Sequence, residues 1–234
     1  MKLLNIDSNA KTKKGVKKGY QTAILYLAPA KLSGYEVCPK RTKGCTEACL
    51  NTAGRGRMSN TQEARIRKTK MFIQKNKEFM ALLVKEIGAH VRRARKKGLI
   101  PVVRLNGTSD IPWENISFYE GSRRYANVME KFPDVQFYDY TKRPNRPRAP
   151  KNYHLTFSLA EDNDDLAKEA LKNKMNVAVV FDKIPERFWR RKVVDGDETD
   201  LRFLDGKGKI IGLRAKGSAK KDASGFVRRL KVLT

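Results

Sequence analysis

The sequence has few of the residues that usually hold metal ions, and no long apolar segment. Its 234 residues include two histidines and three cysteines. No uninterrupted apolar run approaches the ~20 residues needed to cross a bilayer, which excludes an integral membrane protein. No second Cys/His pair stands at finger or ribbon spacing, which argues against a closed four-ligand zinc site.

Acidic side chains are also scarce. Asp and Glu number 25 against 51 Lys and Arg, so the formal net charge is +26, and the excess is spread along the chain. Such charge on a folded body favours binding to nucleic-acid phosphate. Membrane-surface or acidic-protein binding is the alternative, but no basic amphipathic segment carries a bulky aromatic stripe. We therefore expect DNA or RNA as a partner, and no membrane. The basic clusters lie at 11–18, 92–97, 142–151, 190–192 and 216–221.

The three cysteines are concentrated in one polar loop, 38–49, which contains Pro39 and Gly44. Cys38, Cys45 and Cys49 are separated by six and three residues. Three thiolates with no obvious fourth ligand favour a 4Fe-4S cluster with one open iron. Zinc with a water or a distant fourth ligand is the next alternative. Inert thiols and a disulfide with one spare thiol also remain open.

The compartment bears on the disulfide alternative. Met1-Lys2-Leu3-Leu4 is followed at once by Asp7 and Asn9, which does not resemble a secretory signal. We therefore expect a cytoplasmic protein in a reducing environment, where stable disulfides are rare.

Alternating strand-like and helix-like segments predict βα units around a largely parallel sheet. A continuous apolar run such as 177–181 indicates burial on both faces. We expect one α/β domain over 1–234, arranged as a closed or partial barrel, with flexible segments at 1–20, 143–151 and 223–234. The expected strands are 22–28, 100–105, 135–140, 153–159, 177–181 and 209–214, and the expected helices are 59–98 with Ser59 or Asn60 as its cap and Gly98 at its end, 118–131 and 164–173.

Polar side chains follow several of these strands at their carboxyl ends, where α/β proteins assemble their sites. The group after 100–105 could bind a ribose or merely form a capping loop before Pro112. The glycines after the third cysteine could let backbone amides approach a carboxylate or phosphate, or form an ordinary turn. The candidate catalytic residues are Asp110, Tyr138, Tyr140 and Lys142, and the candidate cofactor-binding residues are Asn51, Gly54, Gly56, Asn106, Thr108, Ser109, Ser158 and Glu161.

An acidic run stands out in so basic a chain, at Asp195, Asp197, Glu198 and Asp200. Its carboxylates could bind a divalent metal, but the remaining ligands of a calcium loop are missing. We expect a turn that pairs with Arg202 and Lys192 instead.

The motifs that contain the cysteines and the strand ends, at 37–56, 105–110, 138–142 and 211–217, resemble the bacteriophage gene-product-88-like family over nearly the full chain. More distantly, the chain is similar to phage proteins that look like radical S-adenosylmethionine enzymes. This resemblance implies a partial (β/α) barrel, a 4Fe-4S cluster on Cys38, Cys45 and Cys49, and S-adenosylmethionine at the strand carboxyl ends. The cysteine spacing of six and three departs from the three and two usual in radical enzymes.

Three functions follow from these patterns. The first is a phage-type iron-sulfur enzyme, radical-SAM-like, that acts on nucleic acid or a nucleotide in the host cytoplasm and accepts electrons from a donor protein. The second is a nuclease or nickase, in which Tyr138 or Tyr140 attacks phosphate or clustered carboxylates position magnesium. The third is a non-enzymatic nucleic-acid-binding protein whose fold is held together by a structural metal site.

Overall fold

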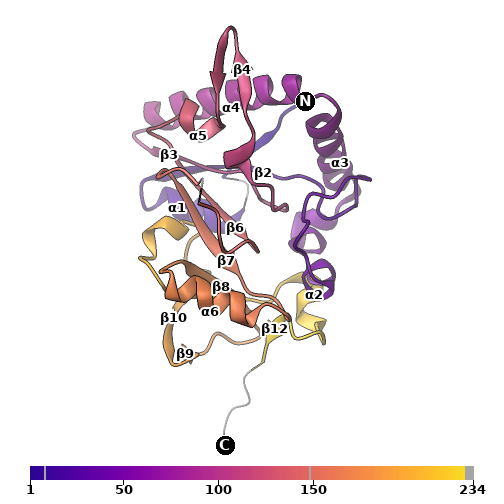
Figure 1. Cartoon of the computed structure of the whole chain (residues 1–234), viewed down its shortest axis with the longest axis vertical. Helices are drawn as coiled ribbons and strands as arrows, with labels where there is room; N and C mark the ends of the chain where they lie inside the picture. Colours follow the sequence, from indigo (N-terminus) through magenta and orange to yellow (C-terminus); the bar gives the residue numbers. More distant parts are fainter. Residues whose placement is uncertain (8, 148, 230–234) are drawn as a thin grey trace, which may run out of the picture.

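A ten-stranded sheet forms the centre of the protein, seen in a computed structural model that describes residues 1–7, 9–147 and 149–229 (Figure 1). The strand order is β1-β2-β3-β6-β7-β8-β11-β10-β9, and β12 pairs with β8. Pairs between β2 and β10 along this path are parallel, whereas β1 and β9 are antiparallel to their neighbours. The strands are β1 Leu4–Ile6, β2 Tyr20–Leu25, β3 Ile100–Arg104, β6 Gln136–Thr141, β7 Tyr153–Ser158, β8 Asn176–Phe181, β9 Arg187–Phe188, β10 Arg191–Asp195, β11 Ile210–Arg214 and β12 Val227–Arg228.

The sheet is open. β1 and β9 stand at opposite ends of the strand order, and no pairing among the described residues joins them. A mixed α/β fold around a mostly parallel sheet is thus confirmed, with strands at each segment where the sequence predicts one. The sheet does not close into a barrel, so the closed or partial barrel that we expected from the sequence is not confirmed.

The two faces of the sheet are covered differently. On one face, Phe79 and Leu83 of α4 pack with Phe137 of β6, and α6 covers a second apolar cluster over β7 and β8. On the other face, Tyr138 packs with Leu201 beside a short 3-10 segment, η4 (Arg202–Leu204). The helices are α1 Ala10–Val16, α2 Lys43–Glu47, α3 Ser59–Gln74, α4 Asn76–Lys96, α5 Val128–Lys131 and α6 Asp164–Lys172.

The helix expected over 59–98 is two helices. The chain leaves helical geometry at Lys75, with φ −132° and ψ 52°, so α3 and α4 are separate helices with a sharp break between them. Ser59 is the first residue of α3 and Met58 occupies the cap position without a side-chain hydrogen bond. Gly98 follows α4 with φ +67°, as a carboxyl-terminal glycine commonly does.

The helix expected over 118–131 is wrong for most of its length. Phe118–Glu120 (β4) and Arg123–Tyr125 (β5) form an antiparallel hairpin, and only α5 is helical. Gly121 has φ +59° at the first central position of the two-residue turn. Glycine there is typical of a type II′ hairpin turn, and this local signal overrides the helical spacing.

The first twenty residues, expected to be flexible, contain β1 and α1, and Leu3 and Leu4 are buried. Asn9 caps α1 by accepting a hydrogen bond from the Thr12 backbone. Of the other segments expected to be flexible, residue 148 and residues 230–234 lie outside the described residues. Within the described part, no helix is both long and apolar enough to span a membrane.

Candidate cofactor site

The cysteine loop begins beyond β2 and rests on the loop that follows β3. The Ala30 backbone N–H donates to Cys38 Sγ at 3.4 Å, and the Cys38 thiol lies 3.7 Å from the Thr108 carbonyl oxygen. The Asp110 backbone N–H also donates to the Val37 carbonyl at 2.9 Å. Cys38 is therefore held at the carboxyl ends of β2 and β3, where the sequence predicts a site.

Cys45 lies on α2, and a carboxylate from another strand end braces this short helix. Thr42 caps α2 by accepting from the Cys45 backbone N–H at 3.0 Å. Glu161, which follows β7, accepts from the Gly44 backbone N–H at 2.6 Å and from the Thr42 hydroxyl at 2.7 Å. The sequence predicts Glu161 as a cofactor-binding residue, whereas these two hydrogen bonds make it a support of the cysteine loop.

Cys49 is followed by a tight loop whose geometry depends on glycine. The Asn51 backbone N–H donates to Cys49 Sγ at 3.5 Å, and Arg65 of α3 donates to the Asn51 side-chain oxygen. A Cβ on Gly56 would meet the Asn51 carbonyl oxygen at 2.8 Å. Gly54 has φ +52°, a backbone conformation that residues other than glycine rarely adopt.

The three thiols influence one another. Burial is the main cause that raises the pKa of Cys38 to about 12; negative charge on Cys49, Cys45 and Asp110 acts in the same direction, and the hydrogen bond from the Ala30 backbone acts against it. Burial likewise raises the pKa of Cys49, with a contribution from Cys45, whereas positive charge on Arg65 and Lys142 acts in the opposite direction. The sulfurs therefore lie within electrostatic reach of each other, and a bound cation would relieve the cost of ionising them.

Among residues 1–7, 9–147 and 149–229, no group of three His, Cys, Asp or Glu is arranged to hold a metal ion. Zinc–sulfur bonds of ~2.3 Å in a tetrahedron would bring three thiolates to within about 4 Å of each other, whereas the cysteines of a 4Fe-4S cluster each ligate a different iron. The cluster and the zinc ion therefore both stay predictions. Backbone N–H groups donate to two of the three sulfurs, Cys38 Sγ and Cys49 Sγ.

Lys142, Asp110 and Ser158 meet beside the cysteines. Asp110 accepts from the Lys142 backbone N–H at 3.0 Å, and the Lys142 ammonium donates to the Ser158 hydroxyl at 3.1 Å. Asp110 is 8% exposed, and its Oδ1 atom is buried without a partner among the described residues. Since Asp110 acts on the pKa of Cys38 and Lys142 on that of Cys49, the strand ends of β3 and β6 bring both charges near the thiols.

The remaining predicted ribose-binding residues make internal hydrogen bonds. The Asn106 side-chain oxygen accepts from Ser109, from the Ile111 backbone and from the Trp113 indole, and Thr108 donates to the Leu27 carbonyl. These contacts shape the loop that carries Asp110. Asn106, Thr108 and Ser109 thus make contacts within the loop, and their role in ribose binding stays a prediction.

Tyr138 and Tyr140 lie on the face of the sheet opposite α4. Tyr138 is fully buried, and its hydroxyl donates to Asp200 at 3.1 Å. Burial and the neighbouring Asp200 carboxylate raise the pKa of Tyr138 well above its ordinary value. Arg104 packs over the Tyr140 ring at 4.8 Å and pairs with Asp200 at 3.1 Å. The structure thus places Tyr138 in a buried polar network, which disfavours it as a nucleophile for a polymer, and leaves Tyr140 half-buried beside Arg104.

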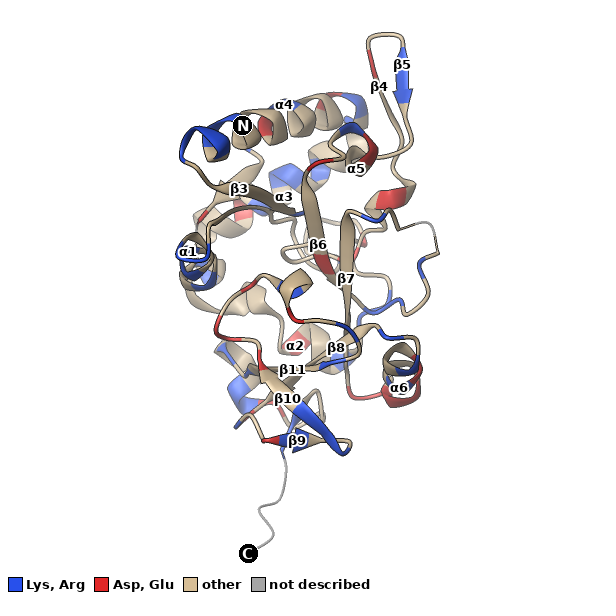
Figure 2. Ribbon diagram, turned by 90° about the vertical axis from the view of Figure 1, so that its left-hand side faces the viewer, with Lys and Arg blue, Asp and Glu red and all other residues tan. Residues whose placement is uncertain are grey.

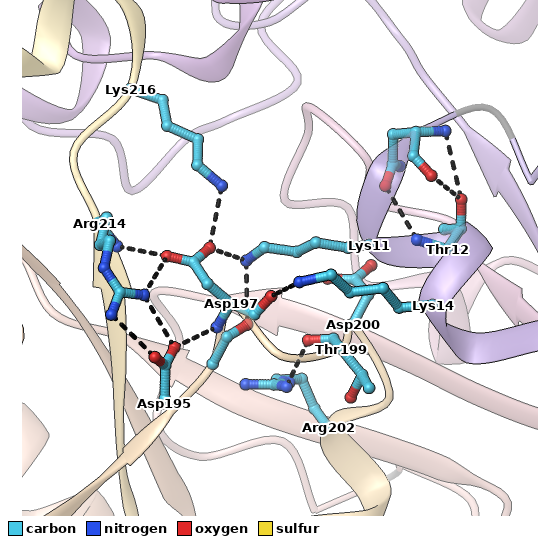
Figure 3. Close-up of polar contacts among 12 residues, drawn as sticks. Lys11, Thr12, Lys14, Asp195, Asp197, Thr199, Asp200, Arg202, Arg214 and Lys216 are labelled. Carbon is cyan, nitrogen blue, oxygen red and sulfur yellow. Dashed lines mark hydrogen bonds and ion pairs between the residues drawn. The ribbon is translucent and has the colours of Figure 1, made fainter. Parts of the chain in front are cut away.

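The acidic run pairs with basic side chains, although with different ones from those expected (Figure 3). Asp197 contacts Lys11, Arg214 and Lys216, and Asp195 contacts Arg214. Arg202, expected as a partner, forms its ion pair with Asp205. The run ties α1 to the end of β11.

Two supporting residues were missed. Thr42 stands three residues before Cys45, a spacing typical of a helix cap, and this signal could have been recognised. Arg65 lies within α3, where nothing in its sequence surroundings distinguishes it from the other basic residues of the helix.

A comparison with protein families finds a match over nearly the whole chain. A family model described as gene product 88 matches residues 1–230. No curated protein and no solved structure matches the chain.

Proposed function

The chain belongs to the gene product 88 family, and we propose that it is an iron-sulfur enzyme, radical-SAM-like, that acts on nucleic acid. Cys38, Cys45 and Cys49 would hold a 4Fe-4S cluster with one open iron. When bound, such a cluster supplies the single electron, delivered by a donor protein, that reductively cleaves S-adenosylmethionine.

The observation that supports this proposal is the placement of Lys142 and Asp110 with the three thiols. Burial raises the pKa of Cys49 and positive charge on Lys142 acts against this rise, while the buried Asp110 has one oxygen without a partner among the described residues. A purely structural metal would require neither an ammonium nor a free carboxylate oxygen next to its ligands. A site that orients a polar cofactor requires such groups.

Each side chain then has a separate task. The Lys142 ammonium, held by Ser158, would bind a carboxylate or phosphate of the cofactor, and Asp110 would accept a hydrogen bond from an amine or hydroxyl. Glu161 and Arg65 would keep the cysteine loop in place from outside. The loop with Asn51, Gly54 and Gly56 would present backbone amides to the same ligand.

The nucleic-acid partner is supported by charge. Lys and Arg lie on helices, strands and connections throughout the molecule, and acidic residues are fewer (Figure 2). A net charge of +26 attracts a polyanion over many contacts. The burial of Tyr138 makes the tyrosine-dependent nickase the weaker alternative.

The test is anaerobic reconstitution with iron and sulfide. Because the chain has three cysteines in total, a variant with all three replaced by serine has no other thiol that could bind iron. We expect the wild-type chain to gain about four irons and the broad absorption of an iron-sulfur cluster, and each single Cys→Ser variant to lose most of both.

Leu50→Ala is the matched control, because Leu50 lies beside Cys49 but is 54% exposed. It should incorporate iron as the wild type does. Stoichiometric zinc without sulfide, or iron uptake that survives the triple replacement, would refute the cluster. A loaded protein in which Lys142→Ala leaves S-adenosylmethionine binding unchanged would refute the role of Lys142.

A further inference from the structure

The β4–β5 hairpin projects beyond α4 and α5 at one end of the molecule (Figures 1 and 2). Residues 119–124 are all exposed. Tyr119 is 67% exposed, which is the highest value among the exposed large hydrophobic side chains of the described residues. A tyrosine at such a position leaves much of its ring exposed to water. Exposing apolar ring surface costs free energy, and a binding partner that covered the ring would remove this cost.

One face of the hairpin is packed. Phe118 stacks on Tyr125 with ring centroids 5.3 Å apart, and Arg123 lies 4.6 Å from the Tyr125 ring. Lys131 of α5 pairs with Glu120 and donates to the Tyr125 hydroxyl. These contacts fix the hairpin on the body of the protein.

The other face carries a different pair. Tyr119 and Arg124 are directly opposite each other across the two strands, and neighbouring strand residues point to opposite faces. Within the described part of the chain, neither side chain has a hydrogen bond, an ion pair or a ring contact. An aromatic ring and a guanidinium therefore stand together on a rigid, outward-facing ribbon.

We propose that Tyr119 and Arg124 form a contact surface for single-stranded nucleic acid, with Tyr119 stacking on an unpaired base and Arg124 binding the adjacent phosphate. The inference rests on the proposed function for the class of polymer, and it adds where and in what form the polymer is held. An exposed ring can stack on a base of any sequence, but only where the base is unpaired. The net charge of +26 complements the phosphate backbone.

The pairing of a cation with an exposed ring distinguishes this surface from the basic cluster at 92–97. Along the chain, the cluster at 92–97 offers charge on a helix end without an aromatic partner. Charge alone binds single and double strands alike, whereas an exposed ring adds affinity only for unpaired bases. The hairpin should therefore create a preference for single strands.

The test measures binding of the full-length protein to a labelled oligonucleotide of about 16 nucleotides, as single-stranded DNA, single-stranded RNA and duplex. The variants are Tyr119→Ala, Tyr119→Phe and Arg124→Gln, with Arg93→Gln as a control that removes one exposed charge from the end of α4. Each of these positions is on the surface, so thermal melting should be unchanged.

Tyr119→Ala should weaken single-strand binding about tenfold or more, and Tyr119→Phe should retain it, because the ring stacks without its hydroxyl. Duplex binding should change little in either variant. Arg124→Gln should reduce the slope of log affinity against log salt by about 0.7, the value for one phosphate contact on a single strand. Arg93→Gln should have a smaller effect than Arg124→Gln.

An unchanged affinity in Tyr119→Ala, or equal losses in Arg124→Gln and Arg93→Gln, would overturn the hairpin surface while leaving the polymer partner intact. Binding of the hairpin to anionic lipid vesicles in place of oligonucleotides would overturn it as well. If the wild-type chain bound no oligonucleotide, both this surface and the nucleic-acid part of the proposed function would fail, whereas cluster assembly is judged separately.

Discussion

Replacing Asp197 by asparagine tests the ion-pair cluster that joins α1 to the end of β11 (Figure 3). Asp197 lies 2.7 Å from the Lys11 ammonium and 2.9 Å from that of Lys216, and it accepts from the Arg214 backbone N–H at 3.0 Å. Lys11 belongs to α1, whereas Arg214 ends β11. The Asp197→Asn variant keeps the shape of the side chain but removes the charge that these cations share.

The expected loss lies between two limits. Removing one partner of a fully buried pair costs about 3–5 kcal/mol, and an exposed pair contributes about 0–1 kcal/mol. The side chains of Lys11 and Asp197 are 20% and 14% exposed, so the pair is closer to the buried limit, but two further partners are about half exposed. We expect Asp197→Asn to lower the free energy of unfolding by about 2–3 kcal/mol. For a chain of this size, Tm should fall by about 4–12 °C.

The assay is thermal and urea unfolding followed by circular dichroism. Asp165→Asn is the matched control, because Asp165 also pairs with a lysine, Lys168, but its side chain is 98% exposed. This control should leave Tm almost unchanged. Equal shifts in the two variants would refute the conclusion that burial makes the Asp197 cluster important for stability.

The ion pairs of Asp197 also predict that the stability of the protein depends on pH. Burial alone would raise the pKa of Asp197, but hydrogen bonds from Lys11, the Arg214 backbone and Lys216 lower it below the ordinary aspartate value. A lowered folded-state pKa means that the stabilisation is complete above about pH 4 and is lost as the pH falls through the folded-state value. The stability difference between wild type and Asp197→Asn should therefore narrow below about pH 4. A difference that stays constant down to acid unfolding would contradict this sign.

Three further variants test the cysteine loop. Gly56→Ala should destabilise the protein more than Gly54→Ala and should reduce iron uptake, because a Cβ on Gly56 would meet the Asn51 carbonyl oxygen at 2.8 Å whereas Gly54 has open space around it. Equal losses, measured by urea unfolding and iron content, would exclude the close approach as the cause. Glu161→Gln should lower the stability by about 1–3 kcal/mol and slow cluster assembly, since an amide cannot replace both acceptor oxygens. If the cluster assembled normally in this variant, the hydrogen bonds to Glu161 would not be needed to hold α2 in position.

The strands and the cysteine loop could be predicted because their signals are local. The runs that became β3 and β8 are mostly apolar, and β7 alternates apolar and polar residues, which periodicity recognises. The hairpin at 118–125 could not be recognised in the same way, because its apolar residues also suit a helix until the effect of Gly121 on the turn is weighed. The break between α3 and α4 at Lys75 could not be predicted, because no glycine or proline marks it in the sequence.

The site was predictable in part for the same reason. The predicted ends of the strands indicated that Asp110, Lys142 and Ser158 lie at the carboxyl edge of the sheet, where the structure has them. Which of the two faces of the sheet a side chain occupies depends on the register of its strand. Tyr138 and Tyr140 occupy the face opposite α4, where they contact Asp200 and Arg104, residues distant in sequence. Long-range pairs of this kind leave no local signal.

The long cysteine spacing is compensated by contacts from outside the loop. Closing six intervening residues instead of three costs about 0.6 kcal/mol of additional chain entropy, because this cost grows only with the logarithm of loop length. The Glu161 carboxylate accepts two hydrogen bonds, from the Gly44 backbone N–H of α2 and from the hydroxyl of its cap Thr42, which contribute about 1.5–3 kcal/mol each before the entropy of ordering Glu161 is subtracted. The bracing is therefore large enough to hold Cys45 in place despite the longer loop. Since Glu161 follows β7, the position of the second sulfur is set by the sheet and not by the spacing of the cysteines.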